Sequence, residues 1–238
     1  MRVQALATDY DGTLAWHSTV EYSTCDALQK LKDSGRKLIL VTGRELHELF
    51  GIFSSARMFD RIVAENGGVL YEPATERSLV LGPEPPERFV DCLRQRGVRP
   101  LSIGHSIVAS QETYCGVIQE VIDELELEWH IILNKGALMV LPRSVDKASG
   151  LIAALNELRL DAAEVVGVGD AENDDAFLSI CGWSVAVANA LDSLKSRADM
   201  VTRESRGAGV QELIRSILED KLPERQRRLI QQELVNKN

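Results

Sequence analysis

The segment Leu6-Ala7-Thr8-Asp9-Tyr10-Asp11-Gly12-Thr13-Leu14 decides how the rest of the chain is interpreted. Its two carboxylates, Asp9 and Asp11, come directly after an apolar run that starts at Val3. We expect residues 3–8 to form a strand of an open parallel sheet, in which ligands bind at the carboxyl ends of the strands. Two carboxylates so close repel each other unless a cation or a proton lies between them. The pattern therefore indicates a Mg²⁺ site, with one carboxylate able to attack an electrophile.

The composition is that of an ordinary globular protein. The chain has 238 residues, of which 45% are hydrophobic and 26% are charged. Its net charge of −9 disfavours non-specific binding to nucleic acid. No apolar run approaches the roughly 20 residues that span a bilayer, and the N-terminus has no signal-peptide pattern. We therefore expect a cytoplasmic protein without a membrane partner. The four separated cysteines, with no Cys-x-x-Cys pair, indicate reduced thiols.

A second strand-and-loop unit follows the acidic segment. A helix over about 23–34 leads to the apolar run 37–41, which ends in Thr42-Gly43-Arg44. This order predicts a right-handed crossover and a parallel sheet, with Thr42 beside the acidic loop. There the Thr42 hydroxyl and nearby backbone N–H groups could hold a phosphate oxygen. A plain strand-to-helix turn with Thr42 as the N-cap explains the same residues equally well.

A third short strand, 62–64, ends in Glu65-Asn66-Gly67-Gly68, and the chain continues extended over 69–71. Asn-Gly-Gly is typical of a tight turn. Asn66 is a candidate for facing the substrate, and turn chemistry alone is the alternative.

The segment Pro83-Glu84-Pro85-Pro86 marks a domain boundary, because prolines interrupt regular structure. Beyond it we expect a helix over 87–96, a strand over 101–109, a helix over 112–127 and a hairpin of strands 129–133 and 137–141. These elements make residues 83–144 a small α+β module, inserted into a core domain formed by 1–82 and 145–220. His105, His130 and Lys135 in the insert are candidate substrate contacts, although a surface role is the simpler interpretation of each.

Two further motifs follow the insert. Lys147 lies near the first turn of a predicted helix, where a cation is unfavourable unless it reaches an anion. A solvated surface lysine is the alternative. The apolar run from Val165 then delivers Gly169-Asp170-Ala171-Glu172-Asn173-Asp174 to a loop. In isolation, this loop would be interpreted as an acidic cap on the next helix.

The four motifs, in this order, resemble those of the haloacid dehalogenase superfamily of phosphatases. Asp9-x-Asp11-Gly-Thr, Thr42, Lys147-x-x-Gly150 and Gly-Asp170-x-x-Asn-Asp174 each match a family motif, and Glu65-Asn66-Gly67 resembles its Cof-like branch. The resemblance spans about residues 3–218. It implies an α/β fold, with a Rossmann-like parallel-sheet core and an inserted α+β cap of the type called C2B.

The resemblance also implies roles for these residues. Asp9 would be the nucleophile, and Asp11 would act as general acid and base while its backbone carbonyl ligates Mg²⁺. Asp170 would be a direct ligand, and Asp174 would orient metal-bound water. Thr42 and Lys147 would stabilise charge on the transferring phosphoryl group. The expected catalytic residues are Asp9, Asp11, Thr42 and Lys147; the metal-site residues are Asp9, Asp11, Asp170 and Asp174; and the phosphate- or substrate-binding residues are Thr42, Gly43, Arg44, Asn66, Lys147 and Asn173.

The expected function is Mg²⁺-dependent hydrolysis of a small phosphorylated metabolite, such as a sugar phosphate, a disaccharide phosphate or phosphoglycolate, through an aspartyl-phosphate. The alternative is a module of a longer protein that senses a phosphorylated ligand with little turnover. Residues 221–238 motivate it, since they form a polar helical pattern that needs a partner to be stable. This tail is interpreted as a linker to a second domain; the alternatives are that it packs on the core or contacts another subunit.

Overall fold

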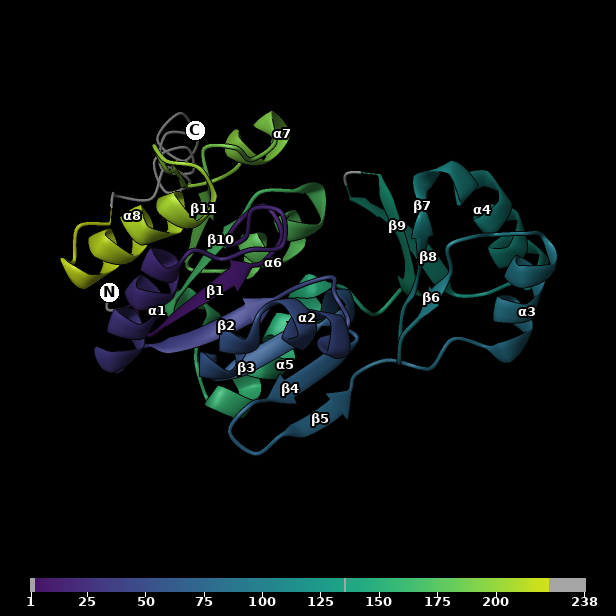
Figure 1. The fold of residues 1–238 in the computed structure, drawn as a ribbon, viewed down its shortest axis with the longest axis horizontal. Helices are drawn as coiled ribbons and strands as arrows, with labels where there is room; N and C mark the ends of the chain where they lie inside the picture. Colours follow the sequence, from purple (N-terminus) through teal and green to yellow (C-terminus); the bar gives the residue numbers. More distant parts are fainter. Residues whose placement is uncertain (1–2, 135, 223–238) are drawn as a thin grey trace, which may run out of the picture. The chain divides into compact units, whose positions relative to one another are not determined.

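The computed structural model describes residues 3–134 and 136–222 (Figure 1). The fold is α/β, with a mixed, mainly parallel core sheet and a separate antiparallel sheet of four strands. The chain forms two compact units, unit 1 (Met1–Ile39 and Leu158–Asn238) and unit 2 (Leu40–Glu157). The strand β2 (Lys37–Val41) begins in unit 1 and ends in unit 2. The predicted division into residues 1–82 with 145–220 and 83–144 stays a prediction, and the predicted tail helix falls on residues 223–238, outside the described residues.

Unit 1 contains the parallel strands expected from the sequence. The strand order is β12 (Met200–Val201), β11 (Trp183–Ala186), β10 (Val165–Gly169) and β1 (Ala5–Asp9), and all neighbours are parallel. Every residue of β1 and β10 is buried, as is typical of parallel strands covered on both faces. The carboxyl ends of β1 and β10 therefore lie next to each other, and each continues into an acidic loop.

The helices α1 (Tyr22–Asp33) and α8 (Arg206–Leu218) lie side by side in unit 1 (Figure 1). Both bury leucines, including Leu28 of α1 and Leu213 of α8. The described part of this unit also contains the α-helices α6 (Asp175–Ile180) and α7 (Asp192–Lys195). None of the helices in the described part of the chain is long and apolar enough to cross a membrane.

Unit 2 begins with the end of β2 and the helix α2 (Leu46–Ile52). Its next strands, β3 (Arg61–Ala64), β4 (Val69–Glu72) and β5 (Arg77–Val80), form an antiparallel meander in which Val63 lies opposite Leu70. The helix α5 (Lys147–Leu158) closes this unit. The sequence analysis predicted the turn between β3 and β4, but it did not predict β5.

The separate antiparallel sheet also belongs to unit 2 and has the order β6-β7-β9-β8. Its strands are β6 (Ser102–Ile103), β7 (Val108–Gln111), β8 (Trp129–Asn134) and β9 (Ala137–Pro142). The helices α3 (Glu87–Gln95) and α4 (Cys115–Glu124) cover one face of it (Figure 1). Leu138 and Val140 of β9 pack on that face with Phe89, whereas Met139 and Leu141 belong to a different buried cluster.

One predicted element of this sheet was wrong. The sequence analysis expected a single strand over 101–109, but the chain turns at Gly104-His105-Ser106 and forms the two antiparallel strands β6 and β7. The Gly104 N–H donates to the Ile107 carbonyl over 2.9 Å, which closes the turn. The apolar residues on both sides conceal this turn in the sequence, since glycine is its only strong turn signal.

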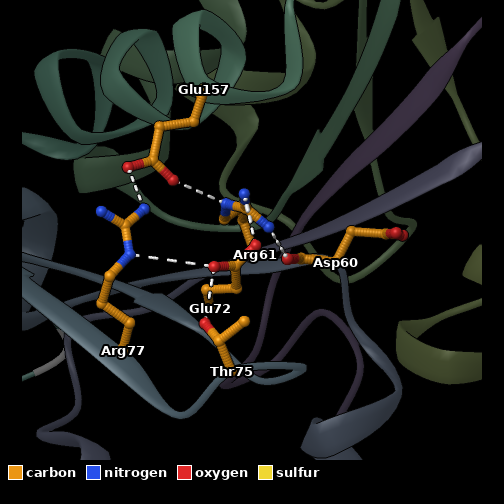
Figure 2. Close-up of polar contacts among 6 residues, drawn as sticks. All are labelled: Asp60, Arg61, Glu72, Thr75, Arg77 and Glu157. Atoms are coloured by element: carbon orange, nitrogen blue, oxygen red, sulfur yellow. Dashed lines mark hydrogen bonds and ion pairs between the residues drawn. The ribbon is translucent and has the colours of Figure 1, made fainter.

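Charged side chains join the meander of unit 2 to α5 (Figure 2). The Arg61 guanidinium contacts the carboxylate of Glu72 at 2.7 Å and that of Glu157 at 2.8 Å, and only 12% of its side chain is exposed. Arg77 contacts the second oxygen of Glu157 at 2.7 Å. The Thr75 hydroxyl donates to Glu72 over 2.6 Å. Because Arg61 is nearly buried and satisfies two carboxylates, it links β3, β4 and α5.

We predict that Arg61→Met lowers the free energy of unfolding by about 2 kcal/mol, because it removes the nearly buried cation that Glu72 and Glu157 share and leaves them only the half-exposed Arg77. The matched control is Arg94→Met. Arg94 pairs with Asp91 where both side chains are about 60% exposed, so its loss should change stability by less than about 0.5 kcal/mol. Urea titration followed by circular dichroism measures both changes. Equal effects of the two substitutions would contradict the role assigned to Arg61.

The same network should respond to acid. The hydrogen bond from Thr75, followed by the charges of Arg61 and Arg77, lowers the pKa of Glu72 below its ordinary value of 4.5. The stabilisation from the Glu72 carboxylate is then complete above pH 4.5 and is lost as the pH falls through the lowered pKa. We therefore expect the stability difference between the wild type and Glu72→Gln to be constant near neutral pH and to shrink below pH 4.5. A difference that grows on acidification would contradict this assignment.

Candidate active site

The acidic loop of unit 1 turns sharply after β1. The N–H groups of Leu14 and Ala15 both donate to the Tyr10 carbonyl, over 3.0 and 2.9 Å. Gly12 has φ +88°, a left-handed conformation that favours glycine, and its N–H donates to the Ala15 carbonyl over 3.1 Å. These bonds fix the backbone around Asp9 and Asp11 at the carboxyl end of the strand.

Three carboxylates gather in unit 1. Asp9, Asp170 and Asp174 are all buried. One carboxylate oxygen from each of them lies within 4.8 Å of the corresponding oxygens of the other two. Like charges this close, away from water, are unfavourable unless a cation neutralises them. Carboxylate oxygens are the ligands that Mg²⁺ and similar hard cations prefer. The residues therefore fit a divalent cation. The Asp11 carboxylate is partly exposed and is not one of the three.

The backbone positions Asp174 within this group. Its Oδ2 atom accepts the N–H groups of Asp170 and Ala171, over 2.8 and 2.9 Å. A Cβ at Gly169 would lie 2.7 Å from the Asp174 side chain. Only glycine at this position lets the Asp174 carboxylate reach the end of β10. Asn173, the other predicted residue of this loop, is also buried.

The sequence analysis missed Asn189 and Thr13 at this site. The Asn189 side chain donates to the Gly12 carbonyl over 2.9 Å and to Asp170 Oδ2 over 3.4 Å, and its oxygen accepts the Arg206 N–H over 2.8 Å. Thr13 donates to Asp170 Oδ1 over 3.4 Å. Asn189 follows β11, and carboxyl ends of parallel strands meet at one edge. That position was the signal that could have identified it.

The loop after β2 is bonded to the turn after β3, within unit 2. The N–H of Thr42 donates to the Val63 carbonyl over 2.8 Å, and the Asn66 N–H donates to the Thr42 carbonyl over 3.0 Å. The Arg44 N–H donates to the Thr42 hydroxyl oxygen over 3.1 Å. The Thr42 side chain is fully buried. These bonds bring together Thr42, Gly43, Arg44 and Asn66.

Lys147 is buried at the first residue of α5, with 2% of it exposed, so the alternative of a solvated surface lysine is wrong. The helix start lies against the turn after β3. A Cβ at Gly67 would lie 1.9 Å from the Asp146 carbonyl oxygen, and a Cβ at Gly150 would lie 2.7 Å from Gly67 Cα. Two glycines thus allow the backbone of the turn to touch the first turn of α5.

The predicted site residues lie in two groups, one in each unit. Unit 1 holds the acids and Asn173, whereas unit 2 holds the hydroxyl, the backbone donors and the buried cation. The unit 1 residues are Asp9, Asp11, Asp170, Asn173 and Asp174, and the unit 2 residues are Thr42, Gly43, Arg44, Asn66 and Lys147. The first group suits a hard cation and a carboxylate nucleophile, and the second suits an anion.

Cysteine chemistry does not contribute to this site. None of the four cysteines, all of which lie within the described residues, forms a disulfide. Cys181 packs against β10, since its Sγ is 2.8 Å from the position that a Cβ would take at Gly167. Burial raises the pKa of the Cys181 thiol far above its usual range, so the thiol stays protonated and unreactive.

Comparisons with known proteins identify the family. The family model for haloacid dehalogenase-like hydrolases matches residues 6–120 and 99–214. The chain is 30% identical to a phosphoglycolate phosphatase of Methanobrevibacter smithii, covering 90% of this chain and 98% of the relative. It is 29% identical to a phosphoglycolate phosphatase of Sulfolobus acidocaldarius, covering 93% of this chain and all of the relative.

A solved structure has the same fold. It is a haloacid dehalogenase-like hydrolase from Bacteroides thetaiotaomicron, with a TM-score of 0.80 and 18% sequence identity over 91% of this chain and all of that chain. The family match extends over both acidic loops, the loop after β2 and the start of α5. The chain therefore belongs to the haloacid dehalogenase-like hydrolases and is a phosphatase of that family.

Proposed function

We propose that this phosphatase is Mg²⁺-dependent and hydrolyses a small phosphate monoester, with phosphoglycolate as the leading candidate. The observation that carries the proposal is the buried cluster of Asp9, Asp170 and Asp174. It combines a carboxylate nucleophile with the oxygen donors of a hard-cation site. Two curated relatives that match over almost their whole length are named phosphoglycolate phosphatases, which favours that substrate over sugar phosphates.

Asp9 is the proposed nucleophile. One of its carboxylate oxygens forms a bond to phosphorus while the bond from phosphorus to the ester oxygen breaks. Asp11 gives its proton to the departing ester oxygen, which leaves as an alcohol. Asp11 then takes a proton from water, and that water attacks the phosphorus of the aspartyl-phosphate. Inorganic phosphate leaves, and the carboxylate of Asp9 is restored.

The partial exposure of Asp11 suits this proton transfer, because the attacking water that gives its proton to Asp11 must be able to reach it. In contrast, Asp170 and Asp174 are fully buried and keep fixed positions, as metal-site residues require. A divalent cation held by Asp9, Asp170 and Asp174 would supply positive charge that reduces the repulsion between the phosphoryl oxygens and the Asp9 carboxylate. Asn189 and the Asp170 and Ala171 N–H groups hold the metal-site carboxylates in place.

Unit 2 supplies the proposed phosphate-binding groups. Lys147 carries a buried positive charge, and such a charge is stabilised by an anion. The Thr42 hydroxyl and the Gly43 N–H offer hydrogen-bond donors in the loop that precedes α2, while the Arg44 N–H donates to the Thr42 hydroxyl oxygen. Asn173 and Asn66 are proposed as further substrate contacts. Together these groups would stabilise the charge of the transferring phosphoryl group.

We predict that Asp9→Asn lowers kcat for phosphoglycolate by about 1,000-fold or more, since an amide cannot form the covalent intermediate. The matched control is Asp26→Asn, which changes a partly exposed aspartate of α1 and should leave kcat unchanged. Phosphate release measures both variants. Activity of Asp9→Asn equal to the wild type would refute the aspartyl-phosphate mechanism.

We also predict that EDTA abolishes turnover and that added Mg²⁺ restores it. A ligand that binds only the folded state stabilises it, so Mg²⁺ should raise the Tm of the wild type without substrate present. Asp174→Asn keeps the shape of the side chain but removes one charge, and should raise the half-saturating Mg²⁺ concentration by about 10- to 100-fold in the same Tm titration. Full activity in EDTA, or an unaltered titration for Asp174→Asn, would count against the metal site.

A further inference from the structure

Two successive residues of unit 2 have a left-handed backbone conformation that residues other than glycine rarely adopt. Glu65 and Asn66, which form the turn after β3, both have φ +52°. Asparagine tolerates this left-handed region, but glutamate rarely occupies it. Such a conformation persists only where the surroundings hold it. Both side chains contact the separate antiparallel sheet, and these contacts explain how the turn is held.

Glu65 binds the loop between β6 and β7. Its carboxylate is 1% exposed; one oxygen accepts the Ser106 N–H over 2.9 Å, and the other lies 3.0 Å from His105 Nδ1. A Cβ at Gly104 would lie 2.6 Å from Glu65 Oε2, so the loop backbone lies directly against the carboxylate. The buried carboxylate is satisfied only with the loop in this position. Glu65 therefore fixes the antiparallel sheet relative to the turn within unit 2.

Asn66 binds Met139 of β9. Its side-chain N–H donates to the Met139 sulfur over 2.9 Å. A Cβ at Gly43 would lie 3.3 Å from the same sulfur and 3.4 Å from Asn66 Oδ1. The Met139 thioether thus lies against Gly43 and Asn66 together, both of which belong to the proposed phosphate-binding group.

Met139 is held firmly in this position. It is 6% exposed and packs in one buried cluster with Ile107, Leu141 and Val145. Methionine is normally a flexible side chain. Here the bond from Asn66 holds the sulfur and the apolar neighbours hold the stem, so the side chain keeps the space next to Gly43 filled.

We propose that Met139 determines substrate size, so that the enzyme accepts a short-chain phosphate ester and rejects a hexose phosphate. This inference rests on the proposed function, in which the residues around Gly43 hold the phosphoryl group. The carbon part of the substrate must then begin next to that group, where the thioether already lies. Met139 is uncharged and its neighbours are apolar, so it offers no strong partner for a sugar hydroxyl. It selects the substrate by occupying the space that a larger ester would need.

The test compares kcat/KM for glucose 6-phosphate with kcat/KM for phosphoglycolate, with both esters assayed on one preparation of each variant. Met139→Ala removes most of the side chain and should raise the ratio of the two values by about tenfold or more. Met139→Leu keeps the volume but removes the sulfur, and should leave the ratio unchanged. The ratio does not depend on the folded fraction, so a destabilised variant still gives a valid result.

Leu133→Ala is the matched control, because it shortens a side chain of the neighbouring strand β8 that is 38% exposed. Its ratio should equal that of the wild type. The inference is overturned if Met139→Ala leaves the ratio of the two kcat/KM values unchanged. It is also overturned if Met139→Leu raises this ratio as much as Met139→Ala does, since side-chain volume would then not be the cause. If either of these outcomes occurs while the wild type hydrolyses phosphoglycolate, only the inference about Met139 fails and the proposed function stands. If the wild type releases phosphate from neither ester, the proposed function and the inference both fail.

Discussion

Repulsion among three buried carboxylates is the constraint on which unit 1 depends. Asp9, Asp170 and Asp174 lie with ligand oxygens within 4.8 Å of one another, without access to the water that would screen their charges. The adjacent parallel strands β1 and β10 force this proximity, since their carboxyl ends emerge side by side. The sheet therefore creates an unfavourable arrangement that a cation relieves. The surrounding backbone N–H groups and Asn189 reduce the remaining cost by binding the carboxylate oxygens.

Unit 2 has the opposite chemistry. Its site residues offer hydrogen-bond donors and a buried ammonium group, arranged around the turn of Glu65, Asn66 and Gly67. A phosphate ester is itself an anion, and a phosphatase must both bind it and bring a carboxylate to it. In the proposed mechanism, the acids of unit 1 and the hydrogen-bond donors of unit 2 are the two kinds of group that this reaction needs.

The sequence was most informative where a strand ends in a chemically distinctive loop. The positions of Asp9 at the end of β1 and of Asp170 after β10 followed from apolar runs alone, and the parallel pairing of these strands is confirmed. The roles of Thr42 and Lys147 depended on the family resemblance, and remain proposals. Asn189 and Met139 were not predicted, because their importance comes from contacts with residues far away in the chain. Glycine alone marked the turn at Gly104, and apolar neighbours on both sides concealed it.

The contact of Gly67 with the start of α5 has a mechanical consequence. The backbone of the turn touches the Asp146 carbonyl, and Gly150 fits against Gly67. No side chain therefore separates the turn from the first turn of α5, and the two backbones cannot move closer together. Asn66 and Lys147 are therefore carried by one stiff block, whose internal spacing is set during folding. If both contact the substrate as proposed, its binding does not need to assemble these two groups from separate mobile parts. The entropy of bringing them together has already been lost before the substrate arrives.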